Sequence, residues 1–316
     1  METDTIGNYF TRPKNIEFIK SGCTLLDCVL GGGYPLGRVV NIVGDRSSGK
    51  TLLAIEAFAN FANQYPDGKM FYHEAEAAFD IDYAEALGMP IDKVTFIEDD
   101  TVENFFTNLE NIIKEFGDSK THVLYVLDSL DALTDEAEKE RKINDGSYAM
   151  TKQKKMSEIF RRLIGDIKHT NICLFIISQV RDNIGVAFGE KFKRSGGKAL
   201  DFYASQVLWL SETQKIKKTV KGIERPYGVN IKAKCKKNKI SLPYRECEFP
   251  ILFGYGIDDY TANINFLSKV KGSFDELGIT DVKKIDKTAM QDIIRDHVIK
   301  VWAETEEPFL PKERKY

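Results

Sequence analysis

The sequence predicts an α/β fold in which helices cover a mainly parallel sheet. Three nearly continuous apolar segments, residues 38–43, 122–130 and 171–179, are typical of strands buried on both faces. Between and around them, residues 50–65, 101–116 and 156–168 repeat apolar side chains at helical spacing. Strands that alternate with helices in this way form parallel sheets. The chain has 316 residues, enough for one large domain with a small appendix.

The composition is that of an ordinary globular protein, with 42% hydrophobic and 29% charged residues. No apolar run is long enough to cross a bilayer, and the N-terminus lacks a basic stretch followed by an apolar one. We therefore expect a cytoplasmic protein with no membrane partner. Its five cysteines are scattered and form no Cys-x-x-Cys pair, which favours reduced thiols and argues against a Cys/His metal site.

Positive charge is concentrated in three segments, although the formal net charge of the chain is only −3. Residues 215–239 contain ten Lys or Arg and one Asp or Glu, residues 139–155 contain six and two, and residues 181–198 contain five and two. Segments of this kind can build a face that binds a polyanion. Solvated loops are the alternative, and charge alone does not separate the two interpretations.

The last third of the chain has a different pattern. After about residue 205 the alternation of apolar and polar residues predicts shorter strands and hairpins, and residues 263–316 predict a small, partly helical region. We expect three parts: a short N-terminal arm that could dock on another subunit, residues 1–20, a core, residues 21–262, and an α-rich C-terminal region, residues 263–316. The sequence leaves the role of this last region open.

A phosphate-binding motif joins the first predicted strand to the helix that follows it. The two glycines allow the backbone to approach a phosphate closely, and the N–H groups at the start of the helix point toward the anion. The lysine would bind the β- and γ-phosphates, and the threonine hydroxyl would bind Mg²⁺. A chance glycine-rich turn is the alternative, but the strand before and the helix after it argue against this. The predicted nucleotide-binding residues are Gly44, Asp45, Arg46, Ser47, Ser48, Gly49, Lys50, Thr51 and Leu52.

Asp128 follows an apolar strand, residues 123–127. Ligands of parallel sheets bind at the carboxyl ends of the strands, where this carboxylate would complete a magnesium site with Thr51. A strand-end aspartate that only caps a turn is the alternative. The two motifs together predict a protein that binds ATP or GTP with Mg²⁺, and many unrelated activities share them.

Longer strings resemble the RecA-type recombinases of bacteria and their phages. They are residues 19–51, 74–89, 126–133, 175–205 and 236–258, in the same order as in that family. The resemblance implies a RecA-like core and ATP as the nucleotide. It also implies DNA-stimulated ATP hydrolysis, a helical filament on single-stranded DNA, and strand exchange with homologous duplex. A single-strand-binding or loader protein is a further partner that it allows.

The resemblance assigns roles to residues beyond the phosphate motif. Glu76 corresponds to the general base, which would orient the attacking water, and such positioning is needed because water is a poor nucleophile. Asp80 and Tyr83 correspond to contacts of the nucleotide base. Gln179 corresponds to the residue that senses the γ-phosphate; a simple strand-end amide is the alternative.

Three residues correspond to positions of the family's subunit interface. Lys237 and Lys239 match lysines that reach the ATP site of the neighbouring subunit, where they would stabilise charge during phosphoryl transfer. If so, hydrolysis requires assembly; two lysines of a solvated hairpin are the alternative. Phe202 matches a residue that packs into the neighbour, although an ordinary core aromatic would also fit.

Residues 180–199 resemble the family's long DNA-binding loop. Glycine N–H groups and basic side chains would bind phosphates, and apolar side chains would approach the bases. Simple packing under the loop is the alternative for the apolar residues. Residues 141–149 resemble the first DNA-binding loop less closely. The predicted DNA-binding residues are Arg181, Ile184, Phe188, Gly196, Gly197 and Lys198.

The sequence also departs from the family. The N-terminal arm is short, which leaves filament formation open, and Asn183 stands where the family has a basic residue. Two other functions therefore stay open: an accessory protein that binds ATP and DNA without strand exchange, and a ring helicase with the same core.

Overall fold

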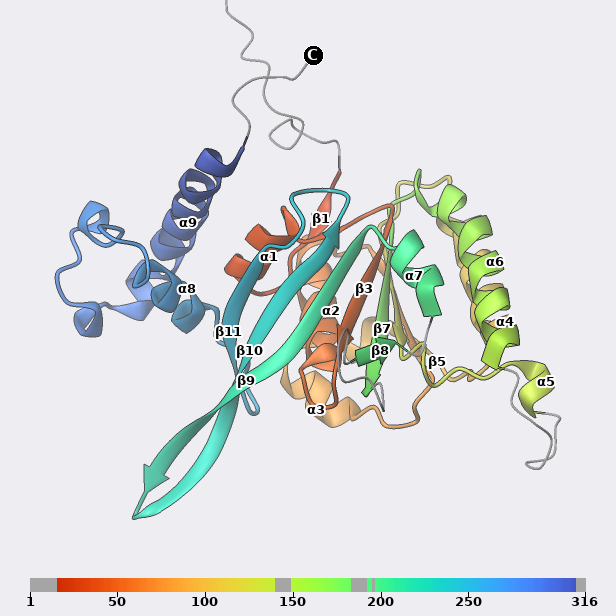
Figure 1. Cartoon of the computed structure of the whole chain (residues 1–316), viewed down its shortest axis with the longest axis horizontal. Helices are drawn as coiled ribbons and strands as arrows, with labels where there is room; N and C mark the ends of the chain where they lie inside the picture. The colour runs from red at the N-terminus through yellow and green to blue at the C-terminus, as the bar shows by residue number, and fades with distance from the viewer. Residues whose placement is uncertain (1–15, 140–148, 183–191, 195–196, 311–316) are drawn as a thin grey trace, which may run out of the picture.

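The structure, a computed structural model, describes residues 16–139, 149–182, 192–194 and 197–310. It confirms the α/β fold: a large, mostly parallel sheet lies between two layers of helices (Figure 1). The order of the hydrogen-bonded strands is β12-β11-β10-β9-β3-β7-β6-β4-β5, with β8 paired to β7. Within these described ranges, no helix combines the length and the apolar character needed to cross a membrane.

The parallel part of the sheet consists of β3 (Arg38–Gly44), β4 (Lys69–Glu74), β5 (Val94–Ile97), β6 (Val123–Asp128), β7 (Ile172–Asp182) and the first part of β9 (Gln206–Val220). The antiparallel part adds β10 (Ile223–Asn238), β11 (Glu246–Leu252) and β12 (Gly256–Ile257). The short strands are β1 (Phe18–Ile19), β2 (Tyr34–Pro35) and β8 (Phe192–Arg194).

The described helices are α1 (Thr24–Leu30), α2 (Lys50–Gln64), α3 (Ile81–Ala86), α4 (Val102–Phe116), α5 (Glu136–Lys139), α6 (Ala149–Ile167), α7 (Gly197–Tyr203), α8 (Asp259–Leu267) and α9 (Lys287–Glu306). Four single 3-10 turns, η1 (Ile91–Lys93), η2 (Asp275–Leu277), η3 (Val282–Lys284) and η4 (Glu307–Phe309), complete the described elements.

Each face of the sheet buries its own apolar cluster, because successive strand residues point to opposite faces. In β3, Val40 and Ile42 belong to the cluster that also contains residues of α1, α2, α8 and α9, whereas Val39 and Val43 belong to the cluster that contains residues of α4, α6 and α7. Burial on both faces is the reason that the central strands are apolar throughout. This packing holds the carboxyl ends of β3, β4, β6 and β7 along one edge of the sheet.

Several elements are longer than the sequence predicts. Strand β7 continues to Asp182 and α7 begins at Gly197, so both ends of the predicted loop 180–199 belong to regular structure. Helix α6 begins at Ala149 and not near residue 156.

The prediction of hairpins after residue 205 is confirmed by the antiparallel pairing of β9 and β10, but the predicted short length is wrong for these two strands, which have 15 and 16 residues. Strand β3 pairs with β9 only as far as Leu210, and β11 pairs with β10 only from Gly228. Beyond these residues the two strands pair only with each other and project from the sheet as a ribbon (Figure 1). Both faces of the ribbon are exposed, so no burial imposes the alternating pattern by which strands are recognised in sequence.

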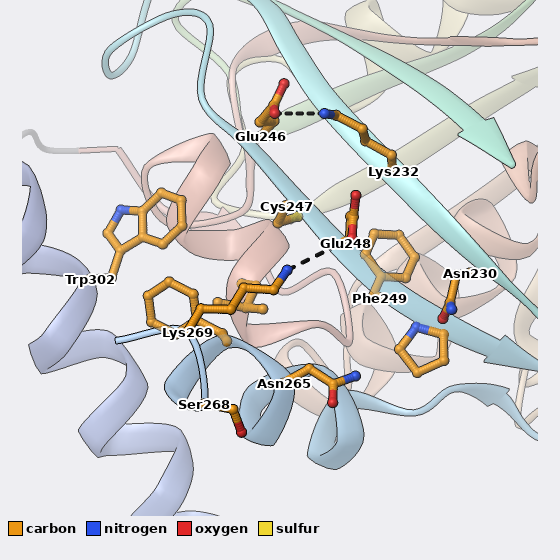
Figure 2. A pocket seen from close by; sticks show the side chains of 13 residues that line it. Asn230, Lys232, Glu246, Cys247, Glu248, Phe249, Asn265, Ser268, Lys269 and Trp302 are labelled. Atoms are coloured by element: carbon orange, nitrogen blue, oxygen red, sulfur yellow. Dashed lines mark ion pairs between the residues drawn. The ribbon is translucent and has the colours of Figure 1, made fainter. Parts of the chain in front are cut away.

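In the C-terminal region α9, with buried Ile294, Val298 and Val301, packs against α1 and α8, and α8 packs against β11. The expected boundary between residues 262 and 263 falls inside α8. A pocket of about 480 Å³ is lined by residues of β10, β11 and the C-terminal helices. Figure 2 shows Trp302 on one side of it. The ion pairs Lys232–Glu246 (2.6 Å) and Lys269–Glu248 (3.8 Å) join residues that line this pocket.

Candidate functional site

The loop between β3 and α2 has the geometry that a phosphate requires. Ser47 and Gly49 adopt left-handed backbone conformations, with φ of 58° and 85°. A Cβ atom on Gly49 would lie 2.7 Å from Ile251 Cδ1, and one on Gly44 would collide with the Ser48 hydroxyl. Among the described residues no side chain caps the N-terminus of α2, so its first N–H groups are available to an anion.

Lys50 is buried at the start of α2, and its Nζ donates to the carbonyl oxygen of Asp45 at 2.7 Å. Burial lowers the pKa of Lys50, while four nearby carboxylates, led by Asp128 and Glu76, counteract this. The ammonium group therefore lies inside the loop and close to several negative charges, where a phosphate oxygen could replace the carbonyl as its partner.

Thr51 and Asp128 meet as predicted at the carboxyl edge. The Thr51 hydroxyl donates to Asp128 Oδ2 at 2.7 Å, and the Tyr72 hydroxyl donates to the same oxygen at 2.9 Å. Burial is the main cause that raises the pKa of Asp128. An oxygen-lined position of this kind suits Mg²⁺, which is bound by one or two protein oxygens plus phosphates and water. The sequence analysis missed Tyr72, because a tyrosine within an apolar strand resembles any core residue.

Glu76 and Gln179 are brought together from different strands. Glu76 follows β4, and its Oε1 accepts hydrogen bonds from Gln179 Nε2 at 2.6 Å and from the Ser129 hydroxyl. Glu74 shapes this loop, because its Oε1 accepts from the backbone N–H groups of Ala78 and Phe79, each at 2.6 Å. The sequence analysis missed Ser129, the residue directly after Asp128.

A cavity of about 240 Å³ adjoins the phosphate loop. Tyr83, for which a contact with the nucleotide base remains a prediction, lines it together with Ser47, Ser48, Gly49, Lys50, Thr51 and Leu52. Asp80 does not line it; its Oδ1 instead accepts from Tyr83 N at 2.9 Å and caps α3. The sequence analysis missed Val229, Ile251 and Phe253, which line the cavity from the antiparallel strands. Their periodicity predicts strands but not which loop those strands face.

Lys237 and Lys239 lie far from the phosphate loop of their own chain. Lys239 N donates to Ser205 O, and Ser205 N donates to Val39 O, each at 2.8 Å. Val39 and Gly44 stand at opposite ends of β3, about 16 Å apart at 3.3 Å per residue. Lys237 Nζ donates to the carbonyl oxygen of Phe202 at 2.8 Å, and the Phe202 side chain is 72% exposed. Phe202 is therefore not an ordinary core aromatic.

The predicted DNA-binding residues are only partly described. Gly197 is the first residue of α7. Arg181 belongs to β7 and Lys198 to α7, although the positions of their side chains are not described. Ile184, Phe188, Gly196 and the predicted first loop up to residue 148 lie outside the described residues.

No group of three or more His, Cys, Asp or Glu side chains is arranged to hold a metal ion within the part of the chain that the structure describes. All five cysteines are free. A divalent ion would thus be held by Thr51, Asp128 and the phosphates of a nucleotide. The residues present fit this arrangement, because the hydroxyl and the carboxylate already converge beside Lys50.

Comparison with known proteins agrees with this arrangement. A family model described as RecA N-terminal domain matches residues 6–258. Protein RecA of Synechocystis sp. is 37% identical over 254 residues, which are 80% of this chain and 69% of that protein. Protein RecA of Rippkaea orientalis is 37% identical over 242 residues, 77% of this chain and 66% of that protein.

Protein RecA of Treponema denticola is 39% identical over 247 residues, which are 78% of this chain and 57% of that protein. The chain therefore matches between 57% and 69% of the length of these relatives. The matched region contains every residue of the phosphate loop and all of its partners at the carboxyl edge of the sheet. On the extent of these matches, this chain belongs to the RecA family.

Proposed function

We propose that this protein is an ATP-dependent recombinase that polymerises on single-stranded DNA and exchanges strands with homologous duplex. Family membership supports the general class. The observation that carries the proposal is the hydrogen bond between Glu76 and Gln179, at 2.6 Å. It links the predicted general base to the end of β7, from which the chain enters the predicted DNA-binding segment, residues 180–199.

With ATP and Mg²⁺ bound, the chemistry at this edge is transfer of the terminal phosphoryl group to water. Glu76 Oε1 is hydrogen-bonded to Gln179 Nε2 and to the Ser129 hydroxyl, so the carboxylate has a defined orientation from which to align a water molecule. Lys50 supplies positive charge inside a loop that excludes part of the solvent. Asp128 supplies a carboxylate oxygen oriented by two hydroxyl donors.

Sites shared between neighbouring subunits follow from the position of Lys237 and Lys239. Because they lie at the opposite end of β3 from the phosphate loop, they would serve the site of another copy. Exposed Phe202, beside Lys237, would pack into that copy. A chain of such head-to-tail contacts generates a helical filament when the rotation between neighbours does not close into a ring.

The basic ribbon of β9 and β10 also supports a polyanionic partner. From Lys215 to Arg225 it carries five Lys or Arg and one Glu. Apart from partly buried Ile216, these residues are exposed, and none packs on the sheet. The charge is therefore held away from the core, where it can face DNA phosphates.

The decisive experiment measures ATP turnover of the full chain with and without single-stranded DNA, followed by joint-molecule formation with homologous duplex. A recombinase shows DNA-stimulated turnover and joint molecules. Stimulated turnover without joint molecules would instead support an accessory protein, and directional unwinding of a duplex would support a helicase. Equal turnover with and without DNA, together with equal DNA binding in the empty, ADP and ATP states, would contradict the proposal. A loader or single-strand-binding protein can be added in a second round.

A further inference from the structure

Asp131 lies in the turn that follows β6 and contacts the end of the neighbouring strand. Its Oδ2 accepts a hydrogen bond from the backbone N–H of Gln179. The turn itself is attached to β7, because Leu130 N donates to Ile177 O at 3.0 Å. Ala132 N, which donates to Ser129 O at 3.1 Å, closes the same turn. Asp131 is thus held directly beside the last residues of β7 that belong to the central sheet.

This contact replaces a strand partner that the sheet does not provide. The pairing of β6 with β7 ends at Leu127 and Ile176, whereas β3 pairs with β7 as far as Gln179. On the side of β7 that faces β6, the N–H group of Gln179 therefore lies beyond the last residue that pairs with β6. An amide N–H that is withdrawn from water must find an acceptor, and the Asp131 carboxylate is that acceptor.

The same glutamine bears the side chain that reaches Glu76. Its Nε2 donates to Glu76 Oε1 at 2.6 Å, and Glu76 also accepts from the hydroxyl of Ser129, two residues before Asp131. One short turn therefore contacts both partners of the Glu76–Gln179 pair. A backbone shift at Gln179 would move its side-chain amide away from Glu76, since a side chain follows the position of its own Cα.

We propose that Asp131 is a positioning residue that fixes the backbone of Gln179. The side-chain amide of Gln179 then meets Glu76, and β7 enters the predicted DNA-binding segment in one orientation. The proposal rests on the proposed function for the role of Gln179 in ATP turnover. It adds a residue to which neither the phosphate motif nor the family resemblance assigned a role.

Asp131 could act instead through its negative charge, because its carboxylate is among those that counteract the effect of burial on the pKa of Lys50. Two substitutions separate these roles. Asp131→Asn keeps an oxygen acceptor for the Gln179 N–H and removes the charge. Asp131→Ala removes both. Asp286→Ala is the matched control, because Asp286 also accepts backbone N–H bonds, from Thr288 and Ala289, but caps the remote helix α9.

The first measurement needs no nucleotide. Hydrogen–deuterium exchange of the full chain reports the protection of the backbone amide of Gln179. We expect Asp131→Ala to raise the exchange rate of this amide by about tenfold or more, because its acceptor is gone. Asp131→Asn should stay near the wild type, and Asp286→Ala should leave the amide unchanged. Equal protection in the wild type and in Asp131→Ala would overturn the proposal.

The second measurement is steady-state ATP turnover in the presence of single-stranded DNA. Asp131→Ala should lower kcat by about 10-fold to 100-fold, as expected for a misplaced group, with KM for ATP within about twofold. Asp131→Asn should recover most of kcat. If the Asn variant is as slow as the Ala variant, the effect comes from the influence of the Asp131 charge on Lys50, and the positioning role is overturned.

A double-mutant cycle with Gln179→Ala gives the sharpest result. If Asp131 acts through Gln179, Asp131→Ala should have no further effect on kcat once Gln179 is alanine. If the loss of kcat in the double variant equals the product of the losses in the two single variants, Asp131 has an independent role and the proposal is contradicted. If the wild type itself shows no DNA-stimulated turnover, the proposed function fails, while the exchange of the Gln179 amide still decides whether Asp131 fixes it.

Discussion

The two ends of strand β3 illustrate two kinds of functional surface. At its carboxyl end, Lys50, Thr51, Asp128, Glu76 and Gln179 meet through hydrogen bonds within one chain. Near its amino end, Lys237 contacts the backbone of exposed Phe202, and Lys239 is linked through Ser205 to Val39, which stands about 16 Å from Gly44 along β3. The first set meets within one chain, whereas we propose that the second set acts only against the site of another copy. On this proposal, binding of a nucleotide and its turnover depend on different ends of the same sheet.

Replacing the lysine of the phosphate loop should have the largest effect. We expect Lys50→Ala to lower ATP turnover by on the order of 10³–10⁵ and to weaken nucleotide binding, because Lys50 puts its positive charge inside the loop. Fluorescent-nucleotide titration and phosphate release measure the two effects. Lys269→Ala, at the remote C-terminal region, is the control. Turnover close to the wild type in Lys50→Ala would remove this end of the sheet as the active site.

Variants at the two ends should complement each other. Glu76→Ala should retain ATP binding and lose about 10²–10⁴ in turnover, since a carboxylate that orients water is gone. Lys237→Ala should also be slow, because a cation supplied from a neighbouring subunit is absent. In an equimolar mixture on single-stranded DNA, on the order of a quarter of the sites would combine an intact Glu76 with an intact Lys237.

Measurable recovery of ATP turnover in that mixture supports shared sites. Sedimentation must first show that each variant still assembles. No recovery from variants that assemble normally would place Lys237 outside the active site and end the comparison between the two ends of β3.

The exposed phenylalanine tests assembly without touching the nucleotide. Because the Phe202 side chain is 72% exposed, Phe202→Ser should change the unfolding free energy of the single chain by only about 0.5 kcal/mol. Loss of an aromatic anchor at an interface should weaken association by about 2 kcal/mol or more. Light scattering with DNA and a non-hydrolysable nucleotide measures assembly. Unchanged assembly would mean that Phe202 serves another partner.

The smallest effect should be on stability. Burial raises the pKa of Asp128, so its ionisation costs folding free energy, and its contribution to stability falls as pH rises through the folded-state pKa. Asp128→Asn should therefore raise the Tm of the nucleotide-free protein by about 2–4 °C at neutral pH, and by less in acid. Thermal denaturation with and without Mg²⁺ and ATP measures this. The variant should also lose the stabilisation that Mg²⁺ and ATP give the wild type. A lower Tm of the nucleotide-free variant than of the wild type at neutral pH would contradict the role of burial.

The central strands and the phosphate motif were predictable because their signals are local. Burial on both faces made β3, β6 and β7 apolar, and the spacing of Gly44, Gly49 and Lys50 follows from one loop geometry. Glu76 and Gln179 required the family resemblance, since a single carboxylate or amide has no pattern of its own. Tyr72, Ser129 and Asp131 were missed for the same reason. The lengths of β9 and β10 were missed because a ribbon exposed on both faces has no buried periodicity.

The layered α/β fold, the phosphate loop and the family can be read from the sequence alone, because each depends on residues that are close together in the chain or on long ordered strings. Three contacts required the folded chain: Asp131 reaches the backbone N–H of Gln179, Asp80 caps a helix and does not line the cavity, and Lys237 lies beside Phe202. Two of these contacts join segments that are far apart in the chain. In the third, the Asp80 carboxylate binds one of several partners that lie close to it. They follow from the order and register of the strands, which no local pattern specifies.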